Sequence, residues 1–176
     1  MTPEKAQYHL LMLRLGHQAS YDRELDRILN EEDPLSPLIL ELALCMSDLN
    51  KTISVLREYL HDRPADQQQV YDLVLSDVHR KYDVKEWNAL QTAGFLWEVR
   101  RAAWDFSEDP WDGLYHLVYE FELYEEGLIS EEVFEEAFDS IFCRGVGLDV
   151  WAMEAARHPK KKKSILDFFR RKGERI

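Results

Sequence analysis

The spacing of apolar residues is the feature of this sequence that most limits its fold. Through most of the chain these residues recur at intervals of three and four positions, which places them on one face of an α-helix. Examples are Tyr8, Leu11, Met12 and Leu15, and further along Val70, Val74 and Val78. No Asn-Gly or Asp-Gly pair lies between alternating segments, as a short β-hairpin would require. We therefore predict an all-α protein.

Start and stop signals divide this pattern into about eight helices over residues 1–157. Thr2-Pro3 and Ser36-Pro37 each pair an N-cap residue with a proline at the first helical position, where its missing N–H costs nothing. Asp83 and Glu86 have the spacing of a capping box and predict a helix start. Further boundaries are expected at Asp48, Pro64, Gly127, Ser130, Gly145 and Asp149. Because no repeat of fixed period is present, a single-domain helical bundle is the expected architecture.

Charge divides the chain into an acidic body and a basic tail. The whole chain has a net charge of −12, but residues 157–176 carry nine Lys and Arg against two acidic residues. That segment has a net charge of +7, so residues 1–156 carry −19. We assign residues 1–157 to an acidic helical domain and residues 158–176 to a basic C-terminal tail. A field of this sign repels nucleic acid and attracts basic proteins, so we expect no direct nucleic-acid binding by the body.

The sequence also predicts a compartment. No run reaches the roughly 18 uncharged apolar residues of a membrane span, and charged side chains interrupt residues 1–15, where a signal peptide is apolar. We expect a cytoplasmic protein without a membrane span. Cys45 and Cys143 both have apolar neighbours on predicted helices, which favours two buried thiols over a disulfide.

Motifs for catalysis are sparse, and we assign no catalytic residue, cofactor or metal ligand. The dipeptide His61-Asp62 resembles the pair used by metal-dependent phosphohydrolases of the HD type, which are helical and add an earlier His and a later Asp. His17, and Asp105 or Asp112, are the residues available for those two places. The resemblance implies a metal phosphohydrolase as an alternative function.

A second group of chemically active side chains falls on one predicted helix. Asp112, His116 and Glu120 are four residues apart and therefore share a helix face, as a metal site or a proton relay would require. Such sites need matching ligands from a second helix, and none stands out. We interpret the three residues as a solvated face.

Five tryptophans are many for this length, and four of them lie between residues 87 and 111. Core packing is their ordinary role, but tryptophan is also the residue most enriched at binding hot spots. The acidic and aromatic segment 105–112 is therefore our first candidate for a partner surface. Its predicted contact residues are Trp104, Asp105, Glu108, Asp109, Trp111 and Asp112.

The tail provides a second candidate surface. After a run of four lysines, Ser164 and Asp167 are placed as an N-cap and its N3 partner, which predicts a short helix. Ile165, Phe168 and Phe169 would form its apolar face. We favour docking of this face on the chain's own body or in a homodimer, because two exposed phenylalanines are a liability in solution. An anionic membrane, a protein partner and nucleic acid are the alternatives.

Residues 162–169 also resemble the peptide box by which replication and repair proteins dock on sliding clamps. In that box an aliphatic residue precedes an aromatic pair by three positions, as Ile165 precedes Phe168-Phe169. Lys162 stands where the box has glutamine. The resemblance implies an accessory factor that docks on a clamp through its tail.

Acidic clusters recur along the body, at residues 31–33, 125–126 and 131–136. A small, acidic, helical chain without catalytic motifs is similar in type to bacterial immunity proteins and phage-encoded inhibitors, whose acidic surface occupies a basic groove. We therefore predict a non-catalytic protein whose acidic surface binds a basic protein partner, a toxin or a nucleic-acid enzyme, as an inhibitor or immunity factor.

Overall fold

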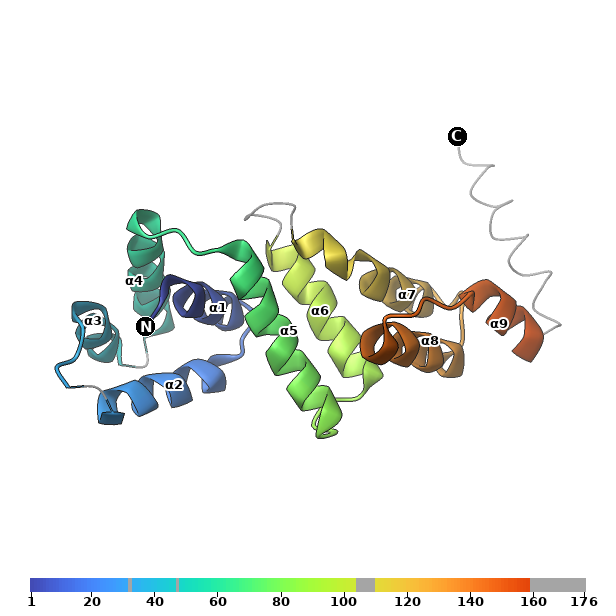
Figure 1. Ribbon diagram of the computed structural model, residues 1–176, viewed down its shortest axis with the longest axis horizontal. Helices are drawn as coiled ribbons and strands as arrows, with labels where there is room; N and C mark the ends of the chain where they lie inside the picture. Colours follow the sequence, from blue (N-terminus) through green and yellow to red (C-terminus); the bar gives the residue numbers. More distant parts are fainter. Residues whose placement is uncertain (32, 47, 104–109, 159–176) are drawn as a thin grey trace. The chain divides into compact units, whose positions relative to one another are not determined.

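The computed structural model describes residues 1–31, 33–46, 48–103 and 110–158, without the side chains of Asp112 and His116. Within this part of the chain the regular structure consists of nine α-helices and one 3₁₀ helix, and no strand occurs (Figure 1). The all-α fold class is therefore confirmed. The tail beyond His158 lies outside the described residues.

The helices gather into two compact units. The first unit contains Met1–Val84 and Glu98–Gly113, and the second contains Lys85–Trp97 and the chain from Leu114 onward. The long helix α6 (Ala89–Ala103) contributes to both, because residues 89–97 belong to the second unit and residues 98–103 to the first.

The first unit is built around its N-terminal helix. Its complete helices are α1 (Pro3–Arg14), α2 (Gln18–Glu31), α3 (Pro37–Cys45), α4 (Leu49–Asp62) and α5 (Gln67–Asp83). Helix α1 packs against α2, α4 and α5, while α3 packs against α2 and α4. Residues 6–13 of α1 are consequently all buried, including the polar side chains of Gln7 and His9. This central helix gives the first unit a core that also contains polar groups.

Side-chain hydrogen bonds confirm several of the predicted helix starts, whereas Ser130 precedes α8 without such a bond. The side chains of Thr2, Ser36 and Asp48 each accept the backbone N–H three residues later, as N-cap residues do. The start of α5 was not predicted, and there Asp66 Oδ1 accepts from Gln68 N and Gln69 N.

The predicted helix start at Asp83 is wrong. Asp83 is the last residue of α5, and Arg80 and Lys81 precede it in the final turn, where cations interact favourably with the helix dipole. The capping box lies further on, at Asn88 and Gln91. Asn88 Oδ1 accepts from Gln91 N at 2.8 Å, and Gln91 Oε1 accepts from Asn88 N at 3.1 Å.

The second unit packs its C-terminal helices around an aromatic core. The 3₁₀ helix Trp111–Leu114, whose first three residues belong to the first unit, leads into α7 (Tyr115–Glu125). Helix α7 packs against α8 (Glu131–Arg144), and α8 packs against α9 (Val150–Arg157). Phe134, Phe138 and Phe142 form a ladder along α8 with ring centroids 5.7 and 5.1 Å apart. Gly127 and Gly145 follow α7 and α8 with φ values of +69° and +67°, a left-handed conformation that glycine adopts without strain, so the predicted stops are confirmed.

The two cysteines differ in exposure. Neither forms a disulfide bond, and Cys45 is buried as expected, but Cys143 is exposed. The buried stripe of α8 runs through Phe134, Phe138 and Phe142, and the residue after Phe142 is rotated by about 100° toward solvent. The expectation of burial for Cys143 is therefore wrong. None of the helices in the described ranges is long and apolar enough to cross a membrane.

Candidate functional site

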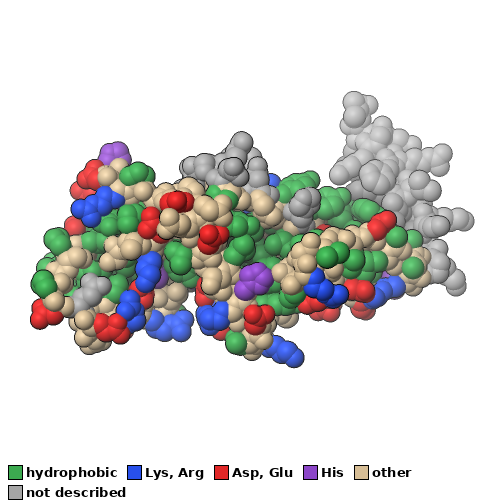
Figure 2. Space-filling model, in the orientation of Figure 1, with side chains coloured by type: hydrophobic (Ala, Val, Ile, Leu, Met, Phe, Trp, Pro, Cys, Tyr) green, Lys and Arg blue, Asp and Glu red, His purple; other side chains and the backbone are tan. Residues whose placement is uncertain are grey.

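Exposed carboxylates cover the outer side of the α7–α8 hairpin. Residues 115–144 contain nine Asp and Glu against one Lys or Arg. The buried faces of α7 and α8 hold the apolar residues, which leaves the glutamates outside, and Figure 2 shows acidic side chains gathered over α8. We call these exposed glutamates the acidic hairpin surface, which consists of Glu122, Glu125, Glu126, Glu131, Glu132, Glu135 and Glu136.

Ion pairs neutralise little of this surface. Arg157 on α9 binds Glu136, and Arg144 binds Asp139 at 3.1 Å. Glu122 instead accepts a hydrogen bond from the indole N–H of Trp97, with 3.2 Å between the heavy atoms. The other five glutamates, Glu125, Glu126, Glu131, Glu132 and Glu135, have no ion pair among the residues that the structure describes.

The helix itself accounts for only part of this charge. Glu131 and Glu132 lie in the first turn of α8, where the dipole favours negative side chains. Glu135 and Glu136 lie one turn further and repel the first pair, at a cost of about 0.2–0.5 kcal/mol for each i,i+4 contact. The second pair of glutamates therefore opposes helix stability.

The partner surface predicted at residues 105–112 falls largely outside the described residues. Trp104, Asp105, Glu108 and Asp109 are not described, nor is the side chain of Asp112. Trp111 is 3% exposed, and its ring packs edge-on against Tyr71 of α5, with centroids 5.5 Å apart. The indole of Trp111 is thus enclosed within the first unit, while binding at this segment stays a prediction. Ile165, Phe168 and Phe169, with the clamp-box resemblance, also lie outside the described residues.

The two candidate metal sites of the sequence have different surroundings. His61 and Asp62 are exposed at the end of α4. Where the structure describes side chains, no group of three His, Cys, Asp or Glu could hold a metal ion. Glu120 does not lie on a solvated face, because it is 6% exposed. Burial raises the pKa of its carboxyl group to about 7, and Oε2 has no hydrogen-bond partner in the described structure.

A polar pocket in the first unit has no counterpart among the predicted sites. It has a volume of about 360 Å³ and lies between α1, α2 and α5. Its charged lining residues are Lys5, Arg23, Glu24, Arg27, Asp77 and Arg80. No motif marks it, because three helices contribute its residues. The close spacing of Arg23, Glu24 and Arg27 on α2 is the one local signal that could have drawn attention to it.

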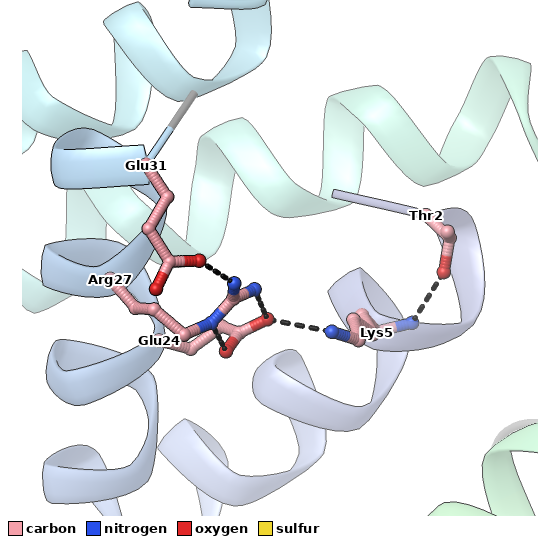
Figure 3. A network of polar contacts seen from close by, with 5 residues as sticks. All are labelled: Thr2, Lys5, Glu24, Arg27 and Glu31. Atoms are coloured by element: carbon pink, nitrogen blue, oxygen red, sulfur yellow. Dashed lines mark hydrogen bonds and ion pairs between the residues drawn. The ribbon is translucent and has the colours of Figure 1, made fainter.

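Three carboxylates bind the cations of this pocket, Glu24 and Asp77 in its lining and Glu31 beside it, on Arg27. Glu24 Oε1 binds Lys5 Nζ at 2.7 Å, and both oxygens of Glu24 bind the guanidinium of Arg27 at 3.0 Å (Figure 3). On the α5 side, Asp77 Oδ1 binds Arg80 at 2.6 Å. Hydrogen bonds from Arg27 and Lys5 outweigh burial and lower the pKa of Glu24 to about 2. Glu24 is therefore ionised throughout the physiological range.

Comparisons with protein-family models, with curated proteins and with solved structures found no match to this chain.

Proposed function

We propose that this chain is a non-catalytic interaction protein whose acidic hairpin surface binds a basic protein partner. The observation that carries the proposal is the set of five exposed glutamates on α7, α8 and the turn between them that have no ion pair among the described residues. Charge complementarity of this kind steers association and fixes the orientation of a complex. Because Glu135 opposes the stability of its own helix, a role in binding gives a reason for its presence.

The biological role that we propose is inhibition or immunity. A basic groove that holds nucleic-acid phosphates in a toxin or another enzyme also accepts a row of carboxylates. A cytoplasmic location is part of the proposal, and two cysteines that form no disulfide suit a reducing compartment.

The proposal can be tested with variants that remove charge from one surface at a time. Glu125→Gln, Glu126→Gln and Glu135→Gln together remove three charges from the acidic hairpin surface, without touching the helix start of α8. Asp26→Asn, Glu41→Gln and Glu58→Gln remove three charges from exposed positions of the first unit and serve as the matched control. Each form is used for affinity capture from the native host, followed by mass spectrometry and by titration of the purified partner.

We expect the wild type and the control to capture the same basic protein and to release it at about 0.5 M salt, where the Debye length falls below roughly 5 Å. The hairpin variant should bind the purified partner at least tenfold more weakly at low salt. Equal binding by both variants, or binding that does not respond to salt, would reject the acidic hairpin surface as the binding site.

A further inference from the structure

We infer that the polar pocket between α1, α2 and α5 binds a small molecule through a phosphate dianion. The pocket lies within the first unit, so it is separate from the acidic hairpin surface. Its volume of about 360 Å³ suits a small ligand.

The sign of the charge in the pocket is the first argument. Four cationic side chains line it, from Lys5, Arg23, Arg27 and Arg80, against the carboxylates of Glu24 and Asp77. The lining therefore has a net charge of +2, in a chain whose overall net charge is −12. Two excess positive charges match a phosphate dianion, and three of the four cations are guanidinium groups, whose donors fit phosphate oxygens in pairs.

The state of the two carboxylates is the second argument. Burial raises the pKa of Asp77, but hydrogen bonds from Lys81, Arg80 and Tyr8 outweigh it, and its pKa lies below the usual value. Glu24 is ionised as well, as described above. Each carboxylate already binds two cations, Glu24 through Lys5 and Arg27, and Asp77 through Arg80 and Lys81, and Glu31 beside the pocket binds Arg27 as well. Carboxylates therefore hold these four cations in place, and because Lys81 and Glu31, which lie outside the lining, add one charge of each sign, the net charge of +2 remains.

Arg23 is the cation best placed to bind a ligand. Its Nε donates to the carbonyl oxygen of Ala19 at 3.2 Å, which orients the guanidinium, and it has no ion pair among the described residues. Its side chain is exposed at the pocket rim. The fold therefore does not depend on the charge of Arg23, and that charge is available to an anion.

Uncharged groups complete the pocket. Tyr8 and His9 line it from the central helix α1. His9 is 4% exposed, and burial lowers the pKa of its imidazole to about 4, so the ring is neutral at pH 7. Its Nδ1 has no hydrogen-bond partner in the described part of the chain. The phenol of Tyr8 donates its proton to Asp77 and offers a ligand only its oxygen as an acceptor, while the neutral imidazole of His9 offers a hydrogen bond to the polar part of a ligand beside its phosphate.

The test is calorimetric titration of the full-length chain at about pH 8, where phosphate esters are dianions. Inorganic phosphate, glycerol 3-phosphate and phosphoserine distinguish free phosphate from a phosphorylated small molecule. Succinate controls for a dianion without phosphate, and sodium chloride controls for ionic strength. We expect at least one phosphate compound to bind at least tenfold more tightly than succinate, with backbone amide NMR shifts confined to α1, α2 and α5.

Two matched variants locate the site. Arg23→Ala should weaken binding of that phosphate compound at least tenfold, with an unchanged helical circular-dichroism spectrum. Arg57→Ala removes the same charge from an exposed position on α4, outside the pocket, and should bind like the wild type. Equal binding of succinate and phosphate compounds, no binding beyond the chloride control, or equal losses in the two variants would each overturn the inference.

Discussion

The hydroxyl of Tyr8 on α1 donates a hydrogen bond to Asp77 Oδ2 on α5, and the ammonium group of Lys81 binds the same oxygen at 2.9 Å. Lys81 is 7% exposed, so its charge is held in the core by this carboxylate. Arg80, which binds the other oxygen, is exposed. Asp77 therefore links the central helix of the first unit to α5 through one charged, partly buried group.

Replacement of Asp77 should lower the free energy of unfolding by more than the exposed Asp77–Arg80 ion pair contributes to it. We expect Asp77→Asn to lower the free energy of unfolding by about 3 kcal/mol, because a buried ammonium group loses its carboxylate partner. Tyr8→Phe should cost about 1 kcal/mol, the usual value of one hydrogen bond. Urea unfolding at pH 7 measures both. Arg80→Ala is the control and should cost less than about 1 kcal/mol, so a loss as large as that of Asp77→Asn would contradict the argument.

Glu120 should make the stability of the protein depend on pH near neutrality. Burial raises the pKa of this carboxyl group from 4.5 to about 7, so the folded state binds its proton more tightly than the unfolded state does. The contribution of this tighter proton binding to the free energy of unfolding is fully present below pH 4.5 and is lost as the pH rises through about 7. We expect the wild type to lose about 3 kcal/mol relative to Glu120→Gln between pH 4.5 and 8.

The comparison with Glu120→Gln isolates this group from others that titrate in the same range. His9 acts in the opposite direction, because its lowered pKa removes stability as the pH falls from 6.5 toward 4. Both forms contain His9, so its contribution cancels in their difference. Glu125→Gln, exposed on the same helix, is the charge-matched control. Parallel curves for the wild type and Glu120→Gln would show that Glu120 is not the titrating group.

The sequence was most informative where a single local interaction determines the structure. An N-cap depends on one side chain and a backbone N–H three residues away, so Thr2, Ser36 and Asp48 could be predicted from sequence alone. Gly127 and Gly145 are comparable, because a left-handed residue after a helix favours glycine wherever it occurs.

Prediction failed where the deciding interaction is made with another helix. Asp83 and Glu86 have the same spacing as Asn88 and Gln91, and both pairs satisfy the rule for a capping box. Which pair begins α6 depends on where α5 ends, and the capping-box rule, which considers only two residues three positions apart, carries no information about that. Glu120 also looked solvated by its type, and its burial depends on how α7 packs. The polar pocket was missed for the same reason, because it exists only when α1, α2 and α5 come together.

Helix α3 is apolar on its exposed side as well as on its buried side, which is unusual for a surface helix. Leu42 is 1% exposed, but Leu44 on the other side is 79% exposed and Met46 just beyond the helix is 84% exposed. We expect Leu42→Ala to cost about 3 kcal/mol of unfolding free energy, and Leu44→Ser to change it by less than about 0.5 kcal/mol. Urea unfolding of the two variants measures this contrast directly.

Leu44 and Met46 also test whether the exposed side of α3 is open to solvent in the full-length protein. Leu44→Ser combined with Met46→Ser should raise the concentration at which light scattering first detects self-association, because it reduces an exposed apolar surface. If Leu44→Ser instead lowers the free energy of unfolding by more than about 1 kcal/mol, Leu44 must be covered in solution, since a side chain that stays in water on folding contributes little to stability.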